Sequence, residues 1–261
     1  MPQDRSPLRD ASLGKAAAYT ALAPYYDRIL AAGYDYSALG RYVAGLISAY
    51  APAARSILEL GAGSCPLAGH LAYPSHARVV YSDLSPAMLA ASSQQPGLRR
   101  VAADATALPF RPGFDVCVML MDALNYLLEA DAVSACLGEA FAALRPGGIF
   151  IVNIAGDALC RELLSDLAQE GSLAECDYAI RAQYDPASRL LRTGFTFRFR
   201  SATEGDPVLR ETHTQRIHTA ATIRELAGRT GFEIAAAFDG QSHNPAGEAS
   251  REIHFVLVRK A

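Results

Sequence analysis

Short apolar runs rich in branched residues alternate with longer stretches of helical periodicity through residues 1–155. Each run is short enough to be a strand buried on both faces. The runs are Ser56–Leu60, Arg78–Ser82, Leu98–Ala102, Phe114–Leu120 and Ile149–Ile154. The helical pattern covers Ser12–Leu30, Ser37–Tyr50, Cys65–Ala72, Pro86–Ser93 and Asp131–Leu144. Strand alternating with helix predicts an α/β fold whose mostly parallel sheet is doubly wound, with helices on both faces.

The pattern changes after the fifth run. Asp157–Gln169 is helical in periodicity, and the next three segments alternate apolar and polar residues as antiparallel strands do. These segments are Tyr178–Tyr184, Leu190–Arg200 and Val208–His218. A helix over Ala220–Thr230 and strands over Phe232–Phe238 and Ile253–Val258 follow, so the chain ends as a hairpin. The whole pattern predicts a seven-stranded sheet with an antiparallel β insertion after its fifth strand.

Composition and charge narrow the class of protein. Hydrophobic residues make up 51% and charged residues 20% of the 261 residues, as in ordinary globular proteins, and the net charge of -3 gives no reason to expect nucleic acid or an anionic membrane as partner. The first residues show no basic region followed by an apolar one, and no apolar run reaches about 20 residues, so neither a signal sequence nor a membrane span is expected. The five scattered cysteines are typical of buried free thiols in a reducing compartment. We therefore expect a cytoplasmic protein with a small, uncharged or cationic partner.

A glycine-containing loop follows the first predicted strand. Glu59-Leu60-Gly61-Ala62-Gly63 leads from the strand into a helix, so a ligand can approach bare backbone there. Asp83 closes the next strand about 20 residues beyond Gly63, the spacing at which an acidic side chain binds a ribose diol. The alternative is that both glycines only make a tight turn. The matched Asp83 favours a cofactor that contains a nucleoside.

Two features of this loop argue against a dinucleotide. A dinucleotide fingerprint has a third glycine three residues after the second, and that position is Pro66 here. Glu59 would repel a pyrophosphate, whereas it suits a ligand that carries an ammonium group and a sulfonium. The loop therefore predicts a positively charged nucleoside cofactor.

Two further motifs complete the set: Asp104-Ala105 after the third strand and Leu144-Arg145-Pro146-Gly147-Gly148 before the fifth. In this order the residues resemble the class I S-adenosylmethionine-dependent methyltransferases, which have a Rossmann-like fold, over Tyr19–Ile154 and the closing hairpin. The resemblance implies a cofactor site made of Tyr26, Glu59, Gly61, Ala62, Gly63, Pro66, Asp83, Leu84, Met88, Asp104, Ala105 and Met121. Within it, Asp83 would hold the ribose, Leu84 and Met88 would sandwich the adenine, and Asp104 with Ala105 would read the adenine edge. Cys65 departs from the family, because many relatives have a third glycine there.

Residues that follow the fourth strand face the bound cofactor in open parallel sheets, so we expect the methyl acceptor there. Asp122, Asn125 and Tyr126 make this segment more polar than packing requires, although Asp122 has an alternative role as a helix cap and Asp104 one as a turn residue. The segment around Tyr26 resembles the Tyr-Asp lid of small-molecule N-methyltransferases that act on glycine or amino sugars, with Tyr36 close behind it. Tyr126 stands where several of those families have a histidine, and a phenol is a poor base at neutral pH.

A polar strand in the insertion is expected to roof the acceptor site. Alternation places Glu211, His213 and Gln215 on one face and Arg216 and His218 on the other. We predict His213 as the general base, with Tyr126, Asp122 and Tyr26 as further catalytic residues. Substrate-binding roles are predicted for Tyr36, Asn125, Gln215 and Arg216. A solvated polar face is the alternative, and a metal is not expected because His213 and His218 point to opposite faces.

The sequence therefore predicts methyl transfer from S-adenosylmethionine to a small molecule, most directly an amine, by in-line displacement. Residues 1–155 and 219–261 would form the core, with 1–50 as a helical lid and 156–218 as the inserted lobe. O- or C-methylation, a non-catalytic cofactor-binding module and an RNA-modifying enzyme remain alternatives, the last through a local patch of Arg192, Arg198 and Arg200. No metal, nucleic acid or membrane partner is expected, and a homodimer is compatible with the sequence.

Overall fold

A computed structural model describes residues 19–20, 22–30, 34–70, 77–91, 97–200 and 208–260. The parts of the expected helices at residues 12–18, 71–72 and 92–93 lie outside these ranges. Within them, no helix is both long enough and apolar enough to cross a membrane.

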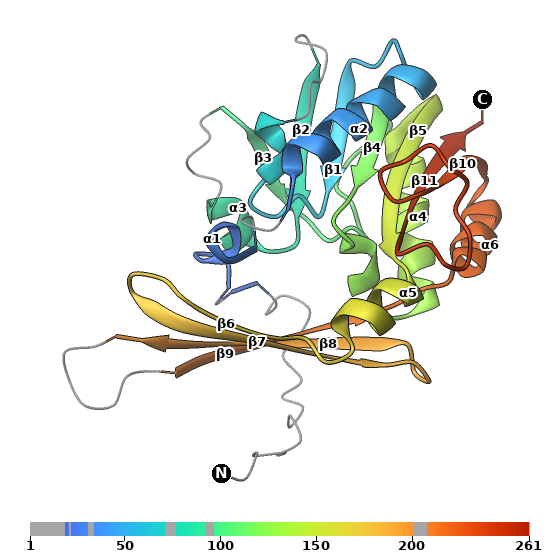
Figure 1. Cartoon of the computed structure of the whole chain (residues 1–261). Helices are drawn as coiled ribbons and strands as arrows, with labels where there is room; N and C mark the ends of the chain where they lie inside the picture. The colour runs from blue at the N-terminus through green and yellow to red at the C-terminus, as the bar shows by residue number, and fades with distance from the viewer. Residues whose placement is uncertain are drawn as a thin grey trace.

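Seven strands form the large sheet, in the order β10-β11-β5-β4-β1-β2-β3 (Figure 1). They are β1 (Ser56–Leu60), β2 (Arg78–Asp83), β3 (Arg99–Ala102), β4 (Phe114–Met119), β5 (Leu144–Ala155), β10 (Phe232–Asp239) and β11 (Glu252–Arg259). Only β11 runs against its neighbours, since it pairs antiparallel with both β5 and β10. The doubly wound, mostly parallel sheet is confirmed.

Helices cover both faces of this sheet because its strands are apolar on both. The helix α2 (Tyr36–Tyr50), capped by the Asp35 side chain, packs with Ile57, Val116 and Ile151 on one face. On the other face α4 (Ala130–Ala143) and α6 (Ala220–Thr230) pack with Leu58, Cys117 and Phe150. The shorter α3 (Pro86–Ala91) follows β2. All five cysteines are buried and free, as expected.

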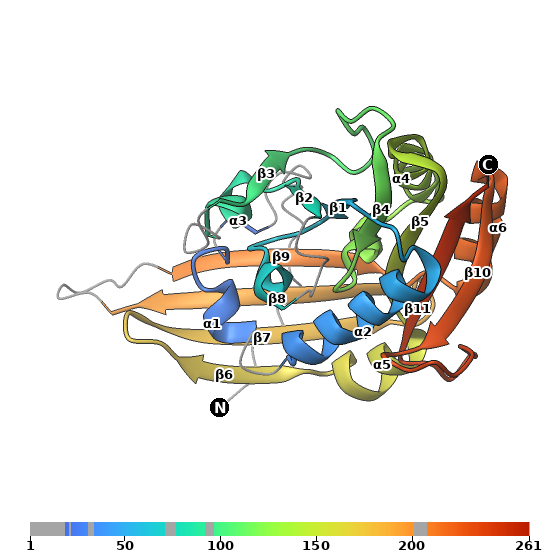
Figure 2. The same cartoon turned by 90° about the horizontal axis from the view of Figure 1, so that it is seen from above.

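A second, antiparallel sheet lies across the carboxyl end of the large one (Figures 1 and 2). Its strands, in spatial order, are β6 (Ala168–Ser172), β7 (Cys176–Asp185), β8 (Leu190–Phe199) and β9 (Val208–Arg216). The one-turn helix α1 (Tyr26–Leu30) lies between the two sheets, and η5 (Ala123–Tyr126), which follows β4, contacts β9. The antiparallel insertion after the fifth strand of the chain is therefore confirmed.

Three expected helices are wrong in part. Residues 19–20 and 22–25 form turns and bends rather than helix, and Tyr19 has a left-handed φ of 65°. After Cys65, whose φ of 57° is also left-handed, only the short 3-10 turn η3 (Pro66–Gly69) forms. The helix expected over Asp157–Gln169 consists of α5 (Asp157–Leu159) and the π turn η6 (Cys160–Leu164), and its last residues belong to β6. The strand β6 has the sequence Ala-Gln-Glu-Gly-Ser and no large apolar residue, so no alternation predicted it.

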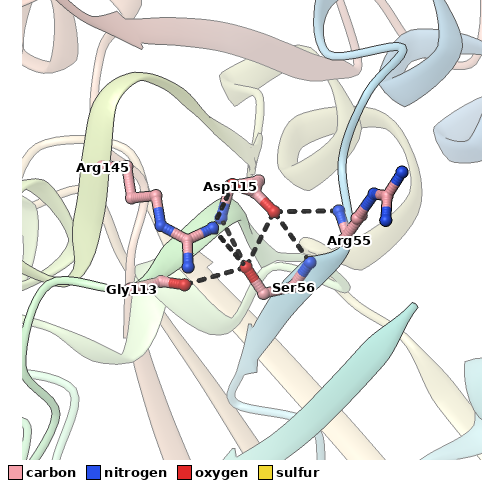
Figure 3. Close-up of polar contacts among 5 residues, drawn as sticks. All are labelled: Arg55, Ser56, Gly113, Asp115 and Arg145. Carbon is pink, nitrogen blue, oxygen red and sulfur yellow. Dashed lines mark hydrogen bonds and ion pairs between the residues drawn. The ribbon is translucent and has the colours of Figure 1, made fainter. Parts of the chain in front are cut away.

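A clamp at the amino end of the large sheet holds β1, β4 and β5 in register (Figure 3). One carboxylate oxygen of Asp115 accepts hydrogen bonds from the backbone N–H groups of Arg55 (2.8 Å) and Ser56 (2.9 Å) and from the Ser56 hydroxyl (2.8 Å). Its other oxygen receives the Arg145 guanidinium at 2.6 Å. We call Arg55, Ser56, Gly113, Asp115 and Arg145 the amino-end clamp.

Candidate active site

The loop between β1 and η3 favours glycine at two positions. Gly61 and Gly63 have φ values of +64° and +56°, a region that side chains with a Cβ rarely adopt. A Cβ on Gly61 would lie 2.7 Å from that of Ala123, and one on Gly63 would lie 3.2 Å from the terminal methyl of Met88. The loop backbone therefore packs closely against η5 on one side and α3 on the other.

This loop forms one wall of a hollow. The lining residues are Tyr26, Glu59, Gly61, Ala62, Gly63, Pro66, Leu67, Leu120 and Met121. The sequence predicted all of them as cofactor contacts except Leu67 and Leu120, which are apolar residues without any signal beyond core packing. The hollow thus gathers residues from α1, β1, η3 and the end of β4 at one place.

Glu59 is the acidic residue among those that line this hollow. Its side chain is buried, and its oxygen Oε2 has no hydrogen-bond partner. Burial, reinforced by the nearby charge of Asp83, raises the pKa of Glu59 to about 8. An orphaned acceptor beside bare backbone fits an ammonium group. The residues present therefore fit the methionine part of S-adenosylmethionine, which would lie along Gly61–Gly63.

Asp83 supports the loop from the end of β2. Its carboxylate accepts the N–H of Gly63 at 2.8 Å and that of Ser85 at 2.7 Å. Burial raises the pKa of Asp83, and these two backbone hydrogen bonds counteract part of that rise. Next to it, Leu84 is 38% exposed and would offer an apolar face to an adenine ring.

The other residues predicted on the adenine side lie as follows. Met88 is fully buried beneath Gly63. One oxygen of Asp104 accepts the backbone N–H and the hydroxyl of Thr106 at 2.8 and 2.7 Å, and Ala105 packs against the main core. Their contacts with the nucleoside remain predictions.

A buried hydrogen-bonded chain connects the two sheets near the hollow. The Nε2 atom of His213 lies 2.5 Å from Oε1 of Glu211, and its Nδ1 atom lies 2.8 Å from the Tyr126 hydroxyl. The Tyr126 hydroxyl in turn lies 2.6 Å from that of Tyr19. We call Glu211, His213, Tyr126 and Tyr19 the relay. Glu211 and His213 share one face of β9, as strand alternation predicted, but Tyr19 was missed because its segment was expected to be helical.

Burial keeps the phenols of this region neutral. It is the largest of the causes that raise the pKa values of Tyr19, Tyr26 and Tyr126. Glu211 also accepts the backbone N–H groups of Tyr19 and Leu22, so it fixes the start of the described chain against β9.

Asp122 belongs to a second polar cluster. The Asn153 side-chain amide donates from Nδ2 to Asp122 (3.0 Å) and to Glu252, and its Oδ1 accepts the backbone N–H of Asp122 at 3.2 Å. The side chain of Asp122 makes no capping bond to η5, so the helix-cap alternative is wrong. Burial raises the pKa of both carboxyl groups, and the charge of Asp122 raises that of Glu252 further. Asn153 and Glu252 were missed.

The four residues predicted to bind substrate lie around these clusters. The Tyr36 hydroxyl is buried without a hydrogen-bond partner, and its ring stacks near His70. Asn125 ties η5 to β9 and β5, by donating to the Arg216 carbonyl and accepting from the Ala155 N–H. Gln215 approaches the Asp122 carbonyl at 3.4 Å, while the Arg216 guanidinium binds the carbonyls of Leu128 and Ser188. Their substrate roles remain predictions.

The described residues contain no group of three or more His, Cys, Asp or Glu side chains that could hold a metal ion.

Comparison with known proteins gives this site a family context. Residues 57–148, from β1 into β5, match the family described as "Methyltransferase domain". No curated protein matches the sequence.

Solved structures resemble the chain over nearly its whole length. An S-adenosylmethionine-dependent methyltransferase from Clostridium acetobutylicum is 20% identical with a TM-score of 0.77, and the match covers 93% of this chain and 99% of that one. The sugar N-methyltransferase KedS8 from Streptoalloteichus is 18% identical with a TM-score of 0.74, covering 100% and 99%. CalS10, an amino pentose methyltransferase from Micromonospora echinaspora with S-adenosylmethionine bound, is 20% identical with a TM-score of 0.69, covering 90% and 96%.

These similarities establish the fold, and the domain match covers the glycine loop, Asp83 and the end of β4. Residues 57–148 thus match a methyltransferase domain, and the chain as a whole has the fold of the S-adenosylmethionine-dependent methyltransferases.

Proposed function

We propose that this protein is an S-adenosylmethionine-dependent methyltransferase that acts on an amine nitrogen of a small molecule, and that the acceptor is an amino sugar. The relay is the main support for this proposal. An amine is protonated at neutral pH and must lose a proton to become a nucleophile, and the relay is a chain of groups that can accept that proton. The printed names of two structural neighbours, a sugar N-methyltransferase and an amino pentose methyltransferase, support the acceptor class.

The relay lies where an acceptor would meet the cofactor. Tyr26 lines the hollow, and its ring centroid lies 5.6 Å from that of Tyr19 in the relay. When bound, S-adenosylmethionine supplies an electrophilic methyl group on a sulfonium sulfur. The small sheet would roof the acceptor through β9, and α1 would exclude water from the reacting atoms.

The relay can take up the acceptor proton in two linked steps. With the Glu211 carboxylate accepting a hydrogen bond from the Nε2–H of neutral His213, the Nδ1 atom is left as an acceptor that faces the Tyr126 hydroxyl. Tyr126 then passes its own proton to His213 while its oxygen accepts the proton of the ammonium group. The amine is released as the nucleophile, and the proton stays on the imidazolium beside the Glu211 carboxylate.

A turnover screen with matched amines and alcohols tests the proposal. We expect methylation of glucosamine-type acceptors and not of their hydroxyl counterparts, with the methyl group located on nitrogen by NMR and mass spectrometry. Methylation of hydroxyl or carbon acceptors alone would contradict the proposal. A gel shift with steep salt dependence would favour RNA instead.

A single substitution tests whether the relay transfers the acceptor proton. Because removal of a proton-transfer group lowers rates by about 100-fold or more, Tyr126→Phe should reduce kcat on the amine by about 100-fold. Tyr50→Phe, at the end of α2, is the matched control and should leave kcat unchanged. An unchanged kcat in Tyr126→Phe would remove the relay from the reaction.

A further inference from the structure

Hydrogen-bond acceptors outnumber donors beside the hollow, where β4, β5 and β11 meet. The carboxylates of Asp122 and Glu252 share a single donor atom, Nδ2 of Asn153. The Nε2 atom of His254 lies 3.6 Å from Oε1 of Glu252 and has no hydrogen-bond partner, although the His254 side chain is 0% exposed. This histidine is therefore buried and directed toward the acidic pair.

The tautomer of His254 makes Nε2 an additional acceptor. Its Nδ1 atom lies 3.0 Å from the Gly240 carbonyl, which can only accept, so Nδ1 carries the proton and Nε2 carries a lone pair. Burial lowers the pKa of His254 to about 4, so the ring stays neutral. Two carboxyl groups and an imidazole lone pair thus lie close together, and the Asn153 amide nitrogen donates hydrogen bonds to the two carboxyl groups.

No cation among the described residues balances this cluster. Arginine and lysine side chains of those ranges form no ion pair with Asp122 or Glu252, and the next residue, Arg251, pairs with Glu162 instead. The other titratable groups that face the pair are neutral and bring no positive charge: Tyr26, Tyr34, Tyr42, Tyr126 and Cys160. Burial keeps Glu252 protonated while no cation is near, and a ligand that brings positive charge and several N–H groups would let both carboxyl groups ionise.

We propose that Asp122 and Glu252 form a subsite that binds the ammonium group of the acceptor, with Asn153 and His254 as positioning residues. The inference deepens the proposed function, since it names the group by which the amine acceptor is held before the relay removes its proton. An ammonium offers three N–H donors, so it can bond the two carboxylates and keep one proton for the relay, whereas a hydroxyl offers one.

The backbone brings this subsite next to the cofactor. Met121, which lines the hollow, and Asp122 both have left-handed φ values, 57° and 59°. Two consecutive residues of this kind are held against their intrinsic preference, a cost that recurs at functional sites. The turn brings the Asp122 carboxylate to the same Asn153 amide as Glu252, while the preceding residue, Met121, lines the hollow.

Ammonium binding should release a proton. Burial and the charge of Asp122 hold the pKa of Glu252 well above its usual range, so without an acceptor Glu252 keeps its proton at neutral pH. A bound ammonium reverses that preference, and the proton leaves for solvent. Proton release therefore distinguishes binding at this pair from binding elsewhere.

Calorimetry with S-adenosylhomocysteine present tests the subsite with glucosamine and glucose as probes. Titrations at neutral pH in two buffers of different ionisation enthalpy should show proton release with glucosamine and tighter binding of glucosamine than of glucose. Glu252→Gln and Asp122→Asn should each weaken glucosamine binding by about tenfold or more, without changing glucose binding. Glu248→Gln, an exposed residue of the preceding loop, is the matched control and should bind like the wild type.

NMR of [15N]histidine-labelled protein gives a second readout. Glucosamine should shift the Nε2 resonance of His254 in a saturable manner, and glucose should not. Equal affinity for the two sugars, wild-type glucosamine binding in both carboxylate variants, or no saturable response up to the solubility of glucosamine would each overturn the subsite. Since the test measures binding without turnover, its failure would leave amine methylation in the screen standing, and a failed screen would leave a positive binding result standing.

Discussion

The two ends of the large sheet place carboxylates in opposite surroundings. At the amino end, the Asp115 carboxylate receives two backbone N–H groups, a hydroxyl and a guanidinium, and these bonds hold its pKa below the usual range even though burial raises it. At the carboxyl end, Glu59 keeps an orphaned oxygen, and Asp122 and Glu252 share one amide nitrogen. The same chemical group is satisfied at one end and short of donors at the other.

We interpret this difference as a division of roles, in which carboxylates at the amino end stabilise the fold and those at the carboxyl end bind ligands. A carboxylate with a full set of donors stabilises the fold, as the amino-end clamp does for β1, β4 and β5. A buried carboxylate with too few donors destabilises the fold, and proteins retain such groups where a ligand completes the set. The opposite responses of matched Asp and Glu variants at the two ends test this interpretation.

The largest effect is expected at Asp122. Asp122→Asn removes one of the two charges that would hold the ammonium group, so kcat/KM for the amine acceptor should fall by about 100-fold, or about 2.7 kcal/mol. Because the charged form is disfavoured by burial, the free energy of unfolding should not decrease. Steady-state kinetics and urea denaturation measure the two quantities. A variant that is less stable but fully active would assign Asp122 to the scaffold.

The reverse response is expected at Asp115. Asp115→Asn cannot accept four donors, so the free energy of unfolding should fall by about 2 kcal/mol, while kcat/KM of the folded protein stays at the wild-type value. Asp131→Asn, in the exposed first turn of α4, is the matched control and should change stability by less than about 0.5 kcal/mol. Equal stability of the Asp115 and Asp131 variants would show that the clamp contributes nothing.

A smaller effect is expected for cofactor binding at Glu59. Glu59→Gln should weaken S-adenosylhomocysteine binding by about tenfold, because a neutral amide replaces the carboxylate that faces the ammonium group. Methylthioadenosine lacks the amino-acid part and should bind the variant and the wild type equally in calorimetry. Glu233→Gln, on the exposed side of β10, controls for loss of one surface charge. If both ligands lose affinity alike, Glu59 shapes the loop rather than contacting the ammonium group.

The cofactor side of the site was predictable because local backbone requirements determine it. Gly61 and Gly63 have positive φ values, which glycine adopts readily, so the residue type itself indicates the turn. Asp83 follows at the sequence spacing that one strand-helix-strand unit sets. The segment from Asp122 to Tyr126 was found because it follows a buried strand at the carboxyl end. Each of these signals is contained within a short stretch of chain.

The acidic pair was not predictable, because it depends on register between strands far apart in sequence. Asn153 and His254 face each other across β5 and β11, and each is a polar residue within an apolar run. That interruption is the one signal the sequence offers, although it does not say which residue lies opposite. Tyr19 was missed for a related reason, since its left-handed turn is stabilised by Glu211 of the distant strand β9.

The smallest expected effect is the pH dependence of stability. The pKa of Glu59 is raised to about 8 in the folded protein, so the folded state binds more protons than the unfolded state above about pH 4.5. Stability from this group is therefore present at low pH and decreases as the pH rises toward 8, by about 1 kcal/mol between about pH 6 and pH 7. Asp115 acts in the opposite sense, because its lowered pKa gives stability that is lost only as the pH falls through the acidic range.

Urea denaturation between about pH 6 and pH 8 measures this pH dependence. The free energy of unfolding should change less with pH in Glu59→Gln than in the wild type, whereas in Asp115→Asn it should change with pH as it does in the wild type. Parallel slopes in all three proteins would mean that Glu59 is ionised in the folded protein and that the two ends of the sheet do not differ in the way their hydrogen bonds indicate.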